Sequence, residues 1–282
     1  MRVLVTGAEG QVGRAVVAAF GTEHRVIACG HRAVDVGDRD QVLAMVTTAE
    51  PDAVVHAAAW TDVDGCEGDA DRAFRVNALG TRHVVEGARL TGARVCYLST
   101  DYVFDGSLDR PYHEWDRPSP LSVYGQSKLG GEAELGPEDT VVRTSWLWDT
   151  SGRNFVRTIL GRARAGGGGE RLRVVDDQRG CPTFAGDLAQ AIRRLVVGRR
   201  PGVYHVTNQG PTSWYGFAQE ILEVAGLDRD LVEPIATTEL DPPRAARRPS
   251  NSVLDNAALR LAGLSLLPDH REPLRRLIDK VL

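Results

Sequence analysis

The sequence predicts a doubly wound α/β protein, a parallel sheet with helices on both faces, followed by a smaller C-terminal cap. Two observations predict this fold class. Valine-rich apolar runs alternate with segments of helical pattern through the first half of the 282-residue chain. Beyond about residue 150 this alternation loosens. We therefore expect one domain over 1–150 and a second region over 151–282, some segments of which return to the main sheet.

Continuous apolar runs, without alternation, are typical of strands that a parallel sheet buries on both faces. The expected strands are 2–6, 25–29, 52–58, 94–100 and 140–145. Helical patterns lie between them, and the expected helices are 11–20, 38–49, 69–91 and 122–135.

The second region carries weaker signals. The run "RAGGGGE" at 164–170 predicts a flexible loop. A helix over 184–197, a strand over 202–208 and a helix over 213–226 follow it. The segment 241–251 is rich in proline and arginine, so it is not regular helix throughout.

Composition excludes several classes of protein. The net charge of −4 argues against a nucleic-acid binder, which neutralises phosphates with an excess of basic residues. The four cysteines form no CxxC and the histidines no HxxH, so no metal site is expected. No signal segment is apparent, and no apolar run approaches the roughly 20 residues that span a membrane. These observations predict a soluble, cytoplasmic protein without nucleic-acid or membrane partners.

A glycine-rich loop joins the first expected strand to the first helix. Its sequence "VLVTGAEGQVG" places Gly7, Gly10 and Gly13 in a GxxGxxG variant of the dinucleotide fingerprint. Such glycines allow a tight turn, the approach of backbone N–H groups to a pyrophosphate, and close helix–strand packing. The motif therefore predicts a Rossmann-like nucleotide site, and its expected lining also includes Glu9, Gln11 and Val12.

The end of the second expected strand bears on the choice of cofactor. Sites that prefer NAD usually place an acidic residue there to bind the ribose hydroxyls. Here His31 and Arg32 occupy that region, and Arg32 is suited to pair with a 2′-phosphate. We expect NADPH, with NADH as the alternative, and we expect Asp35 and Val36 to border the adenine.

The stretch "VYGQSKLGGE" at 123–132 places a tyrosine one helical turn before a lysine. The chain holds only two lysines, Lys128 and Lys280, among its 34 Lys+Arg. On a helix, Tyr124 and Lys128 share one face, and an ammonium beside a phenol favours the phenolate and lowers the tyrosine pKa. A tyrosine tuned in this way can donate and accept a proton near neutral pH.

A candidate third catalytic group lies upstream, in "YLSTDYVFDG" at 97–106. This segment runs off the carboxyl end of an expected strand, where parallel sheets bind their ligands. Thr100 would offer a hydroxyl to the tyrosine and the substrate, and Ser99 is the rival candidate.

Taken together, "TGAEGQVG", "STDYVFDG" and "YGQSKLGGE" resemble the extended short-chain dehydrogenase/reductase family. Similar segments, including "HAAAWTDVDGCE", "RTSWLW", "DDQRGCPT" and "ARRPSNSVLDNAAL", extend the resemblance over nearly the whole chain. Trp60, Gly65 and Cys181 depart from residues that are common in related proteins. These departures lie near the expected substrate and loop regions, so they bear on the sugar more than on the reaction.

The resemblance implies roles for particular residues. Tyr124 would be the catalytic acid, Lys128 its partner and a ligand of the nicotinamide ribose, and Thr100 the third catalytic hydroxyl. The cofactor site would include Ala57, Ala58 and Ala59. The expected substrate contacts are Val63, Asp64, Tyr102, Trp146, Asn154, Gln178, Thr183 and Arg248.

The resemblance also implies a reaction, the NADPH-dependent reduction of the 4-keto group of dTDP-4-dehydro-6-deoxy-L-mannose to dTDP-L-rhamnose. One alternative is a 4-ketoreductase for another dTDP-linked 6-deoxyhexose, from a streptose or antibiotic pathway. A second is a dinucleotide-binding regulatory subunit like that of methionine adenosyltransferase, which the complete Thr100–Tyr124–Lys128 set disfavours. A monomer or a homodimer is expected.

Overall fold

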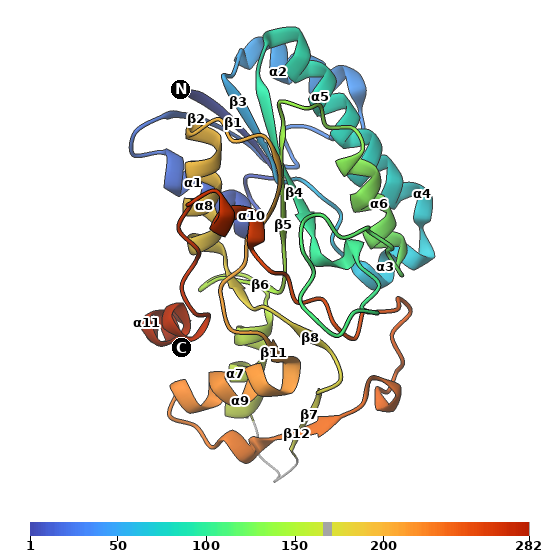
Figure 1. Cartoon of the computed structure of the whole chain (residues 1–282), viewed down its shortest axis with the longest axis vertical. Coiled ribbons are helices and arrows are strands. Elements are labelled where there is room, and N and C mark those ends of the chain that lie inside the picture. Colours follow the sequence, from blue (N-terminus) through green and yellow to red (C-terminus); the bar gives the residue numbers. More distant parts are fainter. Residues whose placement is uncertain (166–170, 282) are drawn as a thin grey trace.

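The valine-rich runs form the strands of one parallel sheet. The computed structural model describes residues 1–165 and 171–281, and Figure 1 shows how the elements are arranged. The main-sheet strands are β1 (Arg2–Thr6), β2 (Arg25–Cys29), β3 (Ala53–His56), β4 (Arg94–Thr100), β5 (Thr140–Thr144) and β10 (Gly202–His205). Their order is β10-β5-β4-β3-β1-β2, and every neighbouring pair is parallel.

Helices cover both faces of this sheet (Figure 1). They are α1 (Gln11–Phe20), α2 (Arg39–Ala49), α3 (Val63–Gly68), α4 (Ala70–Phe74), α5 (Gly80–Thr91), α6 (Val123–Glu132), α8 (Ala185–Val197) and α10 (Ala257–Leu261). A π-helical turn, η1 (Arg75–Leu79), joins α4 to α5, and a 3₁₀ turn, η2 (Asp101–Val103), follows β4. Helices α1 and α8 pack together on one face, and α2 and α5 on the other. The doubly wound fold predicted from the sequence is confirmed.

The order in which the strands follow one another reverses in the middle of the sheet. The chain adds β2 on one side of β1 and β3 on the other, so the strand order reverses between β1 and β3. Open α/β sheets bind ligands in the crevice at such a reversal, outside the carboxyl ends of the strands.

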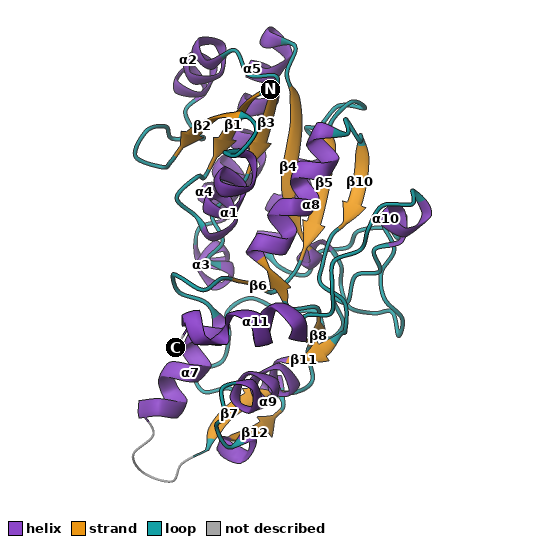
Figure 2. Cartoon of the chain, turned by 90° about the vertical axis from the view of Figure 1, so that its left-hand side faces the viewer, coloured by secondary structure: helices purple, strands orange, loops and turns teal. Residues whose placement is uncertain are grey.

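A smaller lobe lies below the sheet, and Figure 2 shows it beneath the row of main strands. Its elements are β6 (Leu147–Trp148), α7 (Phe155–Ala165), β7 (Leu172–Val175), β8 (Arg179–Gly180), β9 (Thr183–Phe184), β11 (Thr212–Ser213), α9 (Trp214–Val224), η3 (Arg229–Leu231), β12 (Val232–Ile235), η4 (Thr237–Glu239) and α11 (Arg271–Val281). An apolar core of its own, between α7, α9 and α11, includes Ile159, Phe217, Ile221 and Leu274. The glycine-rich part of the expected loop, 166–170, lies outside the described residues.

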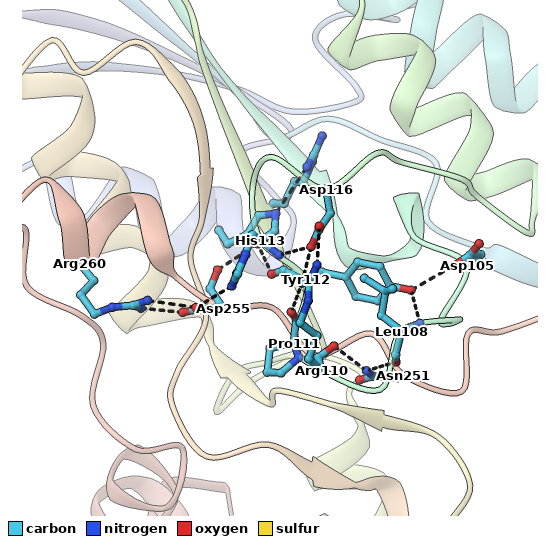
Figure 3. Close-up of polar contacts among 12 residues, drawn as sticks. Asp105, Leu108, Arg110, Pro111, Tyr112, His113, Asp116, Asn251, Asp255 and Arg260 are labelled. Carbon is cyan, nitrogen blue, oxygen red and sulfur yellow. Dashed lines mark hydrogen bonds and ion pairs between the residues drawn. The ribbon is translucent and has the colours of Figure 1, made fainter.

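The chain after β4 is tied to a segment near the C-terminus, as Figure 3 shows. The Tyr112 hydroxyl donates to Asp105 Oδ1 over 2.9 Å, and the Tyr112 backbone N–H donates to the Val253 carbonyl over 2.8 Å. The Asn251 side-chain amide donates to the Leu108 and Arg110 carbonyls, over 2.8 and 3.0 Å. These bonds hold the segment after β4 against 251–255, which follows Arg248 in the chain.

Within the described residues, none of the helices combines the length and the apolar character needed to cross a lipid bilayer.

Candidate active site

A cavity of about 360 Å³ opens at the carboxyl ends of β1, β2, β3 and β4. Its lining includes residues from every cofactor-binding segment that the sequence indicated: Gly7, Glu9, Gly10, Gln11, Val12, Gly13, Asp35, Val36, Ala57, Ala58, Ala59, Tyr124 and Lys128. Other lining residues were not expected: Cys29, Gly30, Val34, Thr61, Val76, Leu98 and Leu147. The cavity is thus lined both by residues at the point where the strand order reverses and by Tyr124 and Lys128 of α6.

Two glycines of the first loop have no room for a side chain. Gly7 has a φ of +64°, and a Cβ there would lie 2.6 Å from the Ala58 nitrogen. A Cβ on Gly13 would lie 2.0 Å from the Gly7 carbonyl oxygen. The loop therefore packs directly on the segment after β3 and leaves its backbone open to the cavity, the arrangement that a dinucleotide pyrophosphate requires.

The far end of the cavity lies at the end of β2. Asp35 and Val36 line it, as expected. The Asp35 carboxylate is held by Arg75, at 3.3 Å, and by the Gly37 backbone N–H, at 2.9 Å. Arg32 is exposed and is not one of the lining residues. Its contact with a 2′-phosphate stays a prediction.

Thr100 and Tyr124 meet at the other end. Ser122 caps α6 by accepting from the Gly125 N–H over 3.2 Å, and Tyr124 follows in the first turn. Thr100 ends β4, and its hydroxyl lies close enough to the Tyr124 phenol to lower the pKa of Tyr124 in part. The Thr100 hydroxyl also donates to Asp101 Oδ1 over 3.0 Å. The rival candidate, Ser99, instead donates to Glu132 over 2.5 Å.

The electrostatics of the pair differ from the sequence-based expectation. Burial raises the pKa of Tyr124 instead of lowering it. Burial also lowers the pKa of Lys128 to about 7. The main cause of both shifts is desolvation, since burial of each side chain disfavours its charged form. Tyr124 therefore holds its proton at neutral pH, as a proton donor must.

The charge of Lys128 is supported by two residues, Tyr97 and Glu132, that were not among the predicted site residues. Its ammonium lies 4.1 Å from the centre of the Tyr97 ring, a cation–π contact. One helical turn onward, Glu132 supports the charged lysine. Glu132 itself forms a buried bidentate pair with Arg143, over 2.9 and 2.7 Å. In the sequence, the only indication of this role is that Glu132 follows Lys128 by four residues, one helical turn.

Asn77 is a second unexpected residue, and it lies in the π-helical turn η1. Its side-chain amide donates to the Trp60 carbonyl over 3.1 Å and to Ser127 Oγ over 2.9 Å, and its oxygen accepts from the Trp60 N–H over 2.8 Å. π-turns occur often at functional sites. This one joins the segment after β3 to α6, between Tyr124 and Lys128.

Three of the expected substrate residues converge beside Tyr124. The Asp64 carboxylate accepts two hydrogen bonds from Arg248, both of 2.6 Å, which hold the Asp64 pKa well below its usual range. Arg248 also lies close to Tyr102, whose ring meets that of Tyr124 edge-on at 6.2 Å. Val63, half-buried, begins α3 next to this cluster.

The remaining expected substrate residues have structural partners of their own. Asn154 caps α7, accepting from the Arg157 N–H over 3.1 Å. Gln178 donates to Thr237 over 2.9 Å, and Thr183, fully buried, donates to the Cys181 carbonyl over 3.2 Å. Trp146 stacks on Trp214. Their contacts with substrate stay predictions.

Over residues 1–165 and 171–281, no three His, Cys, Asp or Glu side chains are grouped so as to hold a metal ion.

Known proteins share this sequence and fold. The chain is 41% identical over 290 residues to a probable dTDP-4,6-dihydroxy-2-methyloxan-3-one 4-ketoreductase of Streptomyces antibioticus, covering 100% of this chain and 96% of that one. It is 37% identical to a dTDP-4-dehydrorhamnose reductase of Sinorhizobium fredii, covering 100% and 98%. The crystal structure of dTDP-4-dehydrorhamnose reductase from Bacillus anthracis in complex with NADP superposes with a TM-score of 0.92 at 35% identity, covering 99% of each chain.

The model of one protein family, described as the RmlD substrate binding domain, matches residues 1–282. The match spans both the main sheet and the smaller lobe. The chain therefore belongs to this family.

Proposed function

We infer that this protein reduces the 4-keto group of dTDP-4-dehydro-6-deoxy-L-mannose with NADPH to give dTDP-L-rhamnose, the activity of a dTDP-4-dehydrorhamnose reductase. One observation carries the inference. Tyr124 and Lys128 line the cavity beside the glycine loop, with Thr100 next to Tyr124, in a chain 37% identical over its whole length to a reductase of that name.

The cavity suits NADPH. Gly7 and Gly13 have no room for a Cβ, and together with Gly10 they would hold the pyrophosphate, whereas Ala57–Ala59 would border the cofactor further along. No acid ends β2, and the exposed Arg32 is near enough in sequence to meet a 2′-phosphate. NADPH supplies the hydride that reduces the sugar carbonyl.

The residues of the chain would supply the proton and the orientation. Tyr124, protonated because its pKa is raised, donates to the alkoxide that develops at C4 of the sugar. The Thr100 hydroxyl, beside Tyr124, would donate to the same carbonyl oxygen and fix its position. Lys128 supports the phenolate left on Tyr124, since a new negative charge in a buried site strengthens the charged form of the lysine.

The substrate's diphosphate needs cationic partners. The cluster of Arg248, Arg244 and Asp64 lies beside Tyr102 and Tyr124, and Asp64 orients both arginines. We propose that this cluster borders the sugar nucleotide. A monomer or homodimer and a cytoplasmic location stay predictions.

The proposal is tested with Tyr124→Phe. Loss of the proton donor should lower kcat by about 100-fold or more, with the KM for NADPH nearly unchanged. The assay follows oxidation of NADPH or NADH with dTDP-4-keto sugars and identifies the product. Undiminished turnover in the variant would show that the mechanism is wrong.

A second candidate function is the reduction of the 4-keto group of a different dTDP-deoxysugar. The 41% identity to a 4-ketoreductase of Streptomyces antibioticus supports another dTDP-deoxysugar as substrate. A panel of dTDP-4-keto sugars separates the two, because the preferred substrate has the highest kcat/KM. Absence of turnover with every sugar would favour the regulatory alternative.

A further inference from the structure

Trp146 adopts a backbone conformation that bulky residues avoid. Its φ is +46°, in the left-handed region, which a bulky residue keeps only where the surrounding structure imposes it. Trp146 lies two residues after β5, and neighbouring bonds hold it there. Its carbonyl accepts from the Thr183 N–H over 3.2 Å, and the hydroxyl of the preceding Ser145 donates to the Cys181 carbonyl over 2.6 Å.

Both faces of the Trp146 indole are covered. The Trp214 ring stacks on one face, with centroids 3.6 Å apart and planes inclined by 8°. A Cβ on Gly180 would lie 2.4, 2.6 and 2.8 Å from Cε2, Nε1 and Cζ2 of Trp146, and such similar distances to adjacent ring atoms place it over a ring face. Two rings this close leave no space between them, so Gly180 covers the opposite face.

Trp214 is itself anchored in the smaller lobe. It is the first residue of α9, whose cap, Ser213, accepts from the Gly216 N–H over 3.0 Å and donates to Asp176. The Trp214 ring contacts Phe155 at 4.6 Å, and Phe155 stacks on Phe217 at 5.8 Å. The indole of Trp146 is therefore continuous with the apolar core of that lobe.

Residues on either side of Trp146 in the chain lie at the candidate site. Thr144, two residues before Trp146, pairs with Thr100 in the sheet, and Leu147, the next residue, lines the cofactor cavity. We propose that Trp214 and Gly180 are positioning residues for the reductase, which hold Trp146 so that its edge, and not its face, meets the nucleotide sugar. This inference rests on the proposed function.

The consequence is measurable in the binding of the sugar nucleotide. If the Trp146 side chain is already held in one position before the sugar nucleotide binds, binding does not have to immobilise it. Immobilising one large side chain costs about 0.5–1.5 kcal/mol, which corresponds to at most about a tenfold change in affinity. Trp214→Leu keeps an apolar side chain at the start of α9 but removes the stack. We expect it to raise the KM for the sugar nucleotide about five- to tenfold, with kcat and the KM for NADPH nearly unchanged. Gly180→Ala should act in the same direction, because its methyl group would displace the indole.

Circular dichroism reports the clamp without turnover, because two stacked indoles couple and give a paired signal. Trp146→Phe and Trp214→Leu should each remove that signal. Trp115→Phe, at a residue 69% exposed, should keep the signal and the kinetics of the parent protein. Trp214→Phe, which restores an aromatic ring, should recover part of the affinity.

Two results would overturn the inference: an unchanged sugar KM in a Trp214→Leu protein that has lost the paired signal, or an equal rise in the KM for NADPH. Calorimetry with dTDP-L-rhamnose keeps this test apart from the proposed function. If the parent protein reduces no sugar, the proposed function fails. If the parent binds dTDP-L-rhamnose and Trp214→Leu binds it equally well, the positioning role fails.

Discussion

At the scale of single residues, the site is governed by the burial of its charged groups. Lys128 is only 3% exposed, and the contacts that support its charge are the Tyr97 ring and Glu132. The other titratable neighbour, His56, is fully buried on β3, and burial with the nearby lysine lowers its pKa to about 3, so it stays neutral. Burying a lysine costs stability unless it is fully compensated.

This leads to a prediction about stability and pH. The Lys128 pKa falls from 10.5 to about 7 in the folded chain. Between these values the unfolded chain binds more protons, so the destabilisation by Lys128 is complete below about pH 7 and disappears towards pH 10.5. Lys128→Met should therefore stabilise the protein, and its advantage should shrink by about 2 kcal/mol from pH 7 to pH 9. Turnover should fall by about 100-fold or more.

Urea unfolding at the two pH values measures the effect. The other lysine, Lys280, is exposed near the end of α11, so Lys280→Met is the matched control and should show no such dependence. An advantage of equal size at pH 7 and pH 9 would contradict the burial argument.

At the scale of elements, α6 is joined to the sheet by one buried ion pair. Glu132 ends the helix, Arg143 lies on β5, and their side chains are 8% and 4% exposed. Ser99 on β4 donates to the same carboxylate, and Arg143 Nη1 lies 3.4 Å from Nε2 of His205 on β10. Side chains from three strands and from α6 thus share one polar network, and Glu132 in that network supports the charge of Lys128, one helical turn earlier.

Breaking this pair on one side should be costly. Glu132→Gln leaves the Arg143 charge buried without its partner, and should lower the free energy of unfolding by about 3–5 kcal/mol. Glu132→Gln with Arg143→Met removes both charges and should cost less than the single change. Glu86→Gln, which removes the exposed partner of Arg39, should cost less than about 1 kcal/mol. A double variant less stable than Glu132→Gln would contradict this account of the network.

The elements also show what sequence patterns can predict. The strands 2–6, 25–29 and 94–100 match their predicted bounds. Strands 2–6 and 94–100 are almost wholly buried in the parallel sheet, whereas 25–29, at the sheet edge, is only partly buried. The expected strand 52–58 is shorter, Ala53–His56, since Ala57 onward turns to line the cavity. The expected helix 69–91 contains the π-turn around Asn77, whose bonds to Trp60 and Ser127 come from the tertiary fold.

The site was predictable to the extent that its residues follow one another along the chain. The glycine loop and the Tyr124–Lys128 pair are local patterns, and the structure places both on one cavity. The Glu132–Arg143 pair and the Trp146–Trp214 stack depend on strand register and on how the smaller lobe packs. Nothing in the spacing of these residues marks them as partners.

At the scale of the whole molecule, the chain passes repeatedly between the main sheet and the smaller lobe. After α7 and β7 in the smaller lobe, α8 returns to pack on α1, and β10 pairs with β5 at the edge of the main sheet. The apolar core between the main sheet and helices α1 and α8 contains seven residues of α8: Ala185, Leu188, Ala189, Ala191, Ile192, Leu195 and Val196. Division of the chain at residue 150 therefore separates residues that share one core.

We accordingly predict that a fragment of residues 1–150 does not fold cooperatively, because it lacks β10 and every α8 side chain of that core. The intact chain tests the same contact. Ile192→Ala, at a fully buried position of α8, should lower the free energy of unfolding by about 2–5 kcal/mol. Val197→Ala, on the same helix but 44% exposed, should change it by less than about 1 kcal/mol. Circular dichroism and urea unfolding measure all three proteins, and a cooperative transition in the fragment equal to that of the intact chain would show that residues 1–150 are an independent domain.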